Sequence, residues 1–157
     1  MDVTSPAFAD GDTIPVEYCA LGVAGGRNAS PPLDWSTPPD GTRSVALAVV
    51  DLHPVARMWV HWALVDMPPS VVSLSAGASG GAATETGGRE LQNTSGRPGW
   101  GGPLPPPDSG VHDYVFTVYA LDVDHLDVPV RPTAADIAAV VAGHTLASGR
   151  LTGRFGR

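Results

Sequence analysis

Four polar side chains occur where predicted strands meet loops, and together they could form one site. Asp51 follows an apolar run, His61 lies just inside the next strand, and His112 and Tyr114 open a third strand after a proline-rich loop. A carboxylate beside an imidazole orients the ring and, in general, raises its pKa. Protonated imidazoles and loop N–H groups bind anions. The sequence therefore predicts an anion pocket, with phosphate as the natural ligand.

Two other interpretations of these residues stay open. Each histidine could be an ordinary hydrogen-bonded core or surface residue. Asp51, His53, His61 and His112 could also supply nitrogen and oxygen ligands to zinc, although no pair has the helical spacing of HExxH. With a metal or a water molecule, the Asp51, His61 and His112 cluster could serve a hydrolase. An enzyme is therefore the alternative to a binding protein that uses no catalytic residue and no cofactor.

A serine motif elsewhere in the chain has a simpler explanation. Residues 77–81 match G-x-S-x-G around Ser79. That motif requires a strand before it and a helix after it. Here it lies within a run of Gly, Ala and Ser, so we interpret Ser79 as a linker residue.

Three predicted strands would position the polar groups. Residues 44–50 form a near-continuous apolar run, typical of a strand that is buried on both faces. Residues 114–121 alternate with period two, and His112 and Tyr114 share one face because they are two apart. Residues 59–66 also alternate, and strict alternation assigns the following residues to one face: Trp59, His61, Ala63 and Val65.

The remaining segments indicate more strands and little helix. Residues 14–18 resemble an edge strand, 75–97 a long surface loop, and 147–155 a final strand. Thr133 to Gly143 is the one convincing helix, with Thr133 as N-cap and Asp136 at the third position. This pattern predicts a mostly β fold: an antiparallel Greek-key β-sandwich with one or two short helices, one of them near the C-terminus. By length, residues 1–157 form a single domain.

Composition excludes several classes of partner. Of the 157 residues, 19 are Gly and 16 are Pro, and all nine basic residues are Arg, with a net charge of −7. The arginines do not cluster, which disfavours nucleic acid and anionic membranes as partners. The lone Cys19 excludes an internal disulfide. Neither a secretion signal nor an apolar run of membrane-spanning length is evident, so we expect a cytoplasmic protein without stable membrane insertion.

Several motifs, taken in order, resemble the phosphatidylethanolamine-binding protein family, which includes the Raf kinase inhibitor protein and bacterial and archaeal relatives. The matching segments are 28–35 (N-x-S-P-P-L-x-W), 51–55 (D-P-D-A-P), 59–62 (W-x-H-W), 99–114 (G-Y-G-G-P-x-P-P, then G-x-H-x-Y), 118–122 (V-Y-A-L-D), and the endings around 143–147 and 153–157. The second acid of the D-P-D-A-P motif is His53 here, and Val55 departs from it as well.

The resemblance implies an all-β sandwich with a small pocket that binds phosphate-like anions and phosphoethanolamine head groups. The residues it places in or around that pocket are Asp51, His53, Trp59, His61, Gly102, Pro106, His112 and Tyr114. It also implies a non-enzymatic protein that regulates a partner, such as a kinase or a protease, by inhibition. Similarity to the shorter bacterial members adds the expectation of a homodimer. The change at His53 predicts that anions bind at least as well as in relatives, with less selectivity for an ethanolammonium group.

Overall fold

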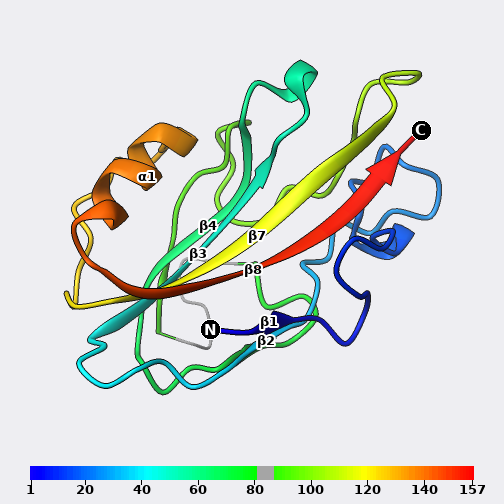
Figure 1. Cartoon of the computed structure of the whole chain (residues 1–157). Coiled ribbons are helices and arrows are strands. Elements are labelled where there is room, and N and C mark those ends of the chain that lie inside the picture. The colour runs from blue at the N-terminus through cyan, green and yellow to red at the C-terminus, as the bar shows by residue number, and fades with distance from the viewer. Residues whose placement is uncertain (81–86) are drawn as a thin grey trace.

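The computed structural model describes residues 1–80 and 87–157, and its fold is mostly β and antiparallel (Figure 1). The larger sheet has the order β6-β4-β3-β7-β8 and the smaller sheet has the order β1-β2-β5. The strands of the larger sheet are β3 (Ser44–Asp51), β4 (Trp59–Met67), β6 (Arg89–Glu90), β7 (Val111–Leu121) and β8 (Thr145–Gly156). Those of the smaller sheet are β1 (Val3–Thr4), β2 (Leu33–Trp35) and β5 (Ser73–Leu74).

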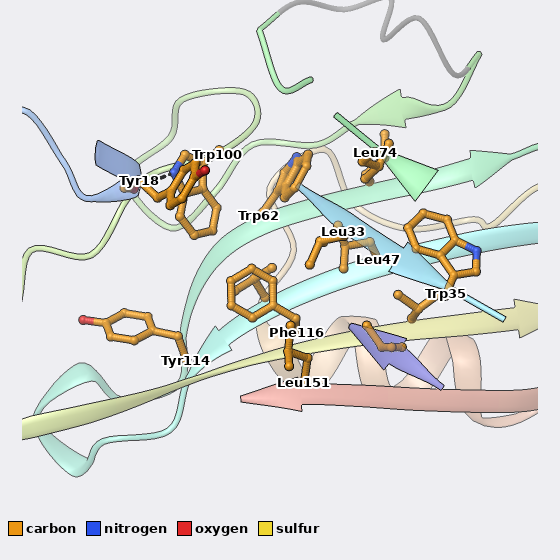
Figure 2. Packing of buried hydrophobic residues seen from close by; sticks show 14 of the residues in the cluster. Tyr18, Leu33, Trp35, Leu47, Trp62, Leu74, Trp100, Tyr114, Phe116 and Leu151 are labelled. Carbon is orange, nitrogen blue, oxygen red and sulfur yellow. Dashed lines mark hydrogen bonds between the residues drawn. The ribbon is translucent and has the colours of Figure 1, made fainter. Parts of the chain in front are cut away.

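Strand β3 lies at the centre of the larger sheet and is buried on both faces, as predicted. Val45, Leu47 and Val49 pack toward the smaller sheet, in the core shown in Figure 2. Ala46 and Ala48 point the other way, toward the helix α1 (Ala134–Ala142). Alternation between large and small apolar residues thus gives one strand two different cores. The strand ends at Asp51, where the apolar pattern ends.

Strand β4 departs from strict alternation at His61. Val49 pairs with Trp62 and Val50 pairs with Val60, so His61 is an extra residue on β4. Such a β-bulge bends the strand and re-aims its side chains. As a result, His61 and Trp62 both approach the indole of Trp100, on the face toward the smaller sheet. The prediction that His61 shares a face with Ala63 is therefore wrong.

Two further predictions about local structure are corrected. The segment 14–18 is not an edge strand, because Val16–Tyr18 forms a short 3-10 helix, η1, directly after Pro15. The segment 75–97 is not all loop: β6 pairs with β4, and Leu91 is buried beside it. Residues 81–86 of that segment lie outside the described residues. A second 3-10 turn, η2 (Pro54–Ala56), lies in the connection between β3 and β4.

The C-terminal region agrees with the sequence. Helix α1 begins after Thr133, whose side chain accepts from the N–H of Asp136 while the Asp136 carboxylate accepts from the N–H of Thr133. This reciprocal capping box satisfies two N–H groups that the first turn would leave unpaired. Ile137 and Val141 pack onto the outer face of the larger sheet. The final strand is longer than predicted and pairs with β7 along its length.

Candidate functional site

An open cavity of about 690 Å³ lies at the end of the larger sheet where β3 ends and β4 and β7 begin. Strand pairing places Asp51 opposite Trp59 on one side and opposite Tyr114 on the other. The loop before β7 and the η2 connection project from this same end (Figure 1). Of the predicted site residues, all except His53 line the cavity. They are Asp51, Trp59, His61, Gly102, Pro106, His112 and Tyr114.

A chain of hydrogen bonds crosses the cavity floor through His112. Its Nδ1 lies 2.7 Å from Oδ2 of Asp51, and its Nε2 lies 2.9 Å from the hydroxyl oxygen of Ser109. That hydroxyl donates its proton to the carbonyl of Pro106 at 2.6 Å, so its oxygen is left to accept from Nε2. Both ring nitrogens then act as donors, which is the pattern of an imidazolium. The network therefore suits a positively charged His112 that is fixed in orientation.

His53 lies behind His112 and outside the cavity wall. The two rings are stacked, with centroids 3.9 Å apart and planes 12° from parallel. The backbone N–H of His53 donates to Oδ1 of Asp51 at 2.8 Å, and its Nδ1 accepts from the N–H of Val55. His53 is thus the N-cap of η2, and its Nδ1 carries no proton while it caps the turn. Its contribution to the cavity is indirect, through the ring and the carboxylate that it supports.

His61 differs from His112 in both partners and protonation. Its Nδ1 donates to the carbonyl of Gly101 at 2.5 Å, and its ring meets that of Tyr114 edge-on. Burial lowers the pKa of His61, and this outweighs the opposing effects of the Gly101 carbonyl and the Asp51 carboxylate. The Asp51 carboxylate acts on the pKa of His61 in the expected direction, but burial has the larger effect, so the carboxylate does not hold this ring protonated. Neutral His61 keeps an unshared electron pair on Nε2.

Tyr114 presents a polar atom with no protein partner. Its ring is fully buried, and its hydroxyl has no hydrogen bond to any described residue. In Figure 2 this hydroxyl points away from the apolar core that the ring helps to form. Burial raises the pKa of Tyr114, and the charge of Asp51 adds to the effect, so the hydroxyl keeps its proton. A buried hydroxyl without a partner is costly, which makes it a marker for a ligand or water position.

The other wall of the cavity is the loop before β7, which is held by close packing at Gly102 and by hydrogen bonds between its backbone and asparagine side chains. At Gly102, a Cβ would lie 2.4 Å from the carbonyl oxygen of Tyr18, so only glycine fits there. The N–H of Gly102 donates to the side chain of Asn28 at 2.7 Å. The buried Asn93 bridges to Gly99 and to Ser95. These contacts agree with a preformed wall rather than a moving lid.

Comparison with known proteins decides the family. The family model described as phosphatidylethanolamine-binding protein matches residues 4–156. This chain belongs to that family. A UPF0098 protein of Methanothermobacter thermautotrophicus is 34% identical over 157 residues, covering 100% of this chain and 99% of the relative. The UPF0098 protein YbhB of Escherichia coli is 34% identical over 158 residues, covering 99% of each.

A solved structure supports the same assignment. The crystal structure of Escherichia coli YbcL, described as a new member of the mammalian PEBP family, superposes with a TM-score of 0.89. It is 30% identical and covers 99% of this chain and 98% of its own. As a member of the phosphatidylethanolamine-binding protein family, this chain is a ligand-binding protein of that type. The family consists in general of binding proteins rather than enzymes.

The site of this family member also contains residues that the sequence did not single out. Ser109 follows the proline-rich loop in an ordinary turn sequence, and only the fold reveals its contact with His112. The residues of the cavity wall that are absent from the prediction are Ala20, Leu21, Gly22, Asn28, Val55, Ala56, Asn93, Ser95, Arg97, Trp100, Gly101, Leu104 and Pro105. Exposed apolar side chains, Leu21, Val55 and Leu104, surround the polar floor. Arg97 is the basic side chain among the described residues of the wall.

Two features are absent from the described ranges, 1–80 and 87–157. No group of three His, Cys, Asp or Glu side chains there is arranged to hold a metal ion, so the predicted zinc alternative has no assembled ligand set in that part of the chain. No helix in the same ranges has the length and apolar character needed to cross a bilayer.

Proposed function

We propose that this protein binds a small anionic ligand, with a phosphate group seated on the floor formed by Asp51, His61, His112 and Tyr114. The observation that carries the proposal is the buried Tyr114 hydroxyl, which has no partner among the described residues and lies at the polar floor of the cavity. A hydroxyl donor and a fixed imidazolium complement an anionic oxygen, and the low dielectric of a buried site strengthens both contacts. Phosphate and phosphoethanolamine-like groups are the ligands we expect.

Calorimetric titration tests this proposal directly. Inorganic phosphate and O-phosphoethanolamine are titrated into the purified protein at pH 6 and pH 8, alongside His61→Ala and His112→Ala. We expect binding at pH 6 that weakens at pH 8, and a loss of at least about tenfold in affinity in both variants, which is about 1.4 kcal/mol. If neither ligand binds the wild-type protein at either pH, the cavity is not an anion site.

His144 offers a matched control for these variants. Like His112, it pairs through Nδ1 with an aspartate, Asp122, at 2.9 Å, but it is partly exposed and does not line the cavity. His144→Ala removes a histidine–aspartate pair without touching the floor. We expect it to bind phosphate as the wild type does, which separates the role of the site from a general effect of losing a histidine.

A hydrolase is the second candidate, and one observation favours it. Ser109, His112 and Asp51 are linked at 2.9 and 2.7 Å, which are distances found in a serine–histidine–aspartate triad. However, the Ser109 proton is directed to Pro106, whereas a nucleophilic serine directs its proton to the histidine. Turnover of p-nitrophenyl esters of acetate or phosphate, abolished by Ser109→Ala, would establish the enzyme. We expect no turnover.

Regulation of a protein partner and self-association extend the proposal. The apolar rim beside a charged floor suits docking on a kinase or a protease, and inhibition assays with purified members of both classes test this. Sedimentation velocity at several protein concentrations tests the homodimer. Both roles remain predictions.

A further inference from the structure

The two histidines on the cavity floor offer a ligand different interactions: His112 offers a positive charge, and His61 offers a hydrogen-bond acceptor. Both nitrogens of His112 are already engaged, with Asp51 and with Ser109, so this ring contributes charge and no free hydrogen-bonding atom. His61 has one nitrogen engaged, because Nδ1 donates to Gly101. Its Nε2 has no hydrogen-bond partner among the described residues, and the ring lines the cavity. With Nδ1 carrying the proton, Nε2 is an acceptor.

The groups that face His61 keep it in that state. Asp51 on β3 favours a charged ring, His112 on β7 disfavours it, and burial, the largest effect, lowers the pKa of His61. Tyr114 on β7 is neutral because burial raises its pKa, and Arg97 adds positive charge at the wall. A ligand therefore meets one acceptor, His61, next to one donor, Tyr114, and one fixed positive charge, His112.

We propose that His61 accepts a hydrogen bond from a P–OH group, so that the cavity selects a singly protonated phosphate or phosphomonoester over a phosphodiester. This inference rests on the proposed function. A phosphomonoester monoanion has the required atoms on one phosphorus: a charged oxygen for Tyr114 and a protonated oxygen for His61. A phosphodiester carries the same single charge but no P–OH, so when it covers the cavity floor it gives Nε2 of His61 no hydrogen-bond donor.

The proposal has a linked consequence for protons. Phosphomonoesters lose their second proton at about pH 6, so at pH 8 the free ligand is mostly a dianion. Binding the singly protonated form then requires the uptake of about one proton, and the affinity falls by about tenfold per pH unit above that range. A site that binds the dianion through two imidazolium donors gives a different result below pH 6, where it loses affinity as the dianion disappears.

The experiment compares methyl phosphate with dimethyl phosphate in the full chain. At pH 5 both probes carry one negative charge and differ only in P–OH against P–OCH₃, so the pair isolates the hydrogen bond to His61. We expect methyl phosphate to bind at least about tenfold more tightly, a difference of about 1.4 kcal/mol. At pH 8, calorimetry in buffers of different ionisation enthalpy should show uptake of about one proton per methyl phosphate bound, and ³¹P NMR should show the bound phosphate as protonated.

The variant His61→Gln tests the residue itself. Glutamine places an amide near the position of Nε2 and can donate or accept without titrating. We expect it to bind methyl phosphate at pH 8 with no proton uptake and to lose the preference for the monoester. If this variant does not fold, the monoester-to-diester ratio and the proton uptake of the wild type still decide the question.

The outcomes separate this inference from the proposed function. Equal affinity for the two probes at pH 5, or binding at pH 8 without proton uptake, overturns the role of His61 while leaving an anion pocket in place. Much tighter binding of O-phosphoethanolamine than of methyl phosphate, without proton uptake, overturns it as well, because an ammonium group would then be the donor to His61. If no phosphate probe binds at any pH, the proposed function itself fails.

Discussion

Asp51 and Asp66 are two carboxylates at opposite ends of the β3–β4 pair, and they occupy different kinds of environment. Asp66 is mostly buried, and every contact it makes is structural: Oδ2 accepts from Arg89 and from His125, and Oδ1 accepts from the N–H of Leu126 at 2.9 Å. Asp51 also accepts a backbone N–H and pairs with a histidine, at 2.7 Å. The first cluster ties β4 to β6 and to the loop after β7, whereas the second borders a cavity.

The difference between the two clusters lies in what is left unpaired. At Asp66 the guanidinium of Arg89 supplies a full positive charge, and both carboxylate oxygens have protein partners, so a ligand is not needed to complete the cluster. Beside Asp51, the Tyr114 hydroxyl and Nε2 of His61 have no hydrogen-bond partner among the described residues. A satisfied polar cluster stabilises the fold, whereas a partly satisfied one indicates a place where a ligand completes the network.

The largest expected effect separates the two carboxylates. Asp66→Asn leaves Arg89 without its counter-charge and should lower the free energy of unfolding by about 2–3 kcal/mol, with phosphate affinity unchanged. Asp51→Asn should weaken phosphate binding by about tenfold, because His112 loses the carboxylate that accepts from its Nδ1 and fixes the ring on the cavity floor. Urea denaturation and calorimetry on both variants provide the two measurements.

This comparison fails if the two variants behave alike. Equal losses of phosphate affinity in Asp66→Asn and Asp51→Asn would mean that the sheet transmits any local damage to the cavity. Arg89→Met, which removes the partner instead of the carboxylate, is the matched control, and it should reproduce the stability loss of Asp66→Asn without affecting binding.

The pH dependence of stability should expose the cost of burying His61. Because burial lowers its pKa, the folded protein stays neutral at His61 while the unfolded chain takes up a proton below about pH 6.5. Stability is therefore greatest above that pH and falls as the pH decreases, by up to about 1.4 kcal/mol per pH unit. Urea unfolding between pH 5.5 and 7.5 measures this slope.

Two variants assign that slope to a residue. In His61→Gln the slope should flatten over this range, because glutamine does not titrate. In His125→Gln, which alters an exposed histidine at the Asp66 cluster, the contribution of His61 should remain. An unchanged slope in His61→Gln would show that another group binds the proton.

The sequence predicted most of the fold and part of the cavity lining. Asp51, His112 and Tyr114 follow from local patterns, whereas other predicted lining residues, such as Gly102 and Pro106, follow from the family resemblance. Alternation placed His112 and Tyr114 on one face of β7, and the end of an apolar run placed Asp51 at the end of β3. The orientation of His61 could not be predicted, because a β-bulge inserts one residue and period two does not reveal it. Ser109 was missed for another reason. Its role depends on the ring of His112 lying against its hydroxyl, and a serine in a turn can bond to many different groups, so the sequence does not specify this partner.

The smallest change in stability should come from Tyr114→Phe, and it is the sharpest test of the difference between the two clusters. The variant removes a buried hydroxyl that has no protein partner, so the unliganded protein should unfold with an unchanged free energy or one higher by up to about 1 kcal/mol. Phosphate affinity should fall by about tenfold, because the hydroxyl donor to the ligand is lost. Stability and affinity then move in opposite directions at one atom, as expected where unpaired polarity is retained for binding. A clear loss of stability in the absence of ligand would instead mean that the hydroxyl stabilises the fold through a bound water. The polar cluster around Asp51 would then be a structural one, like the cluster around Asp66.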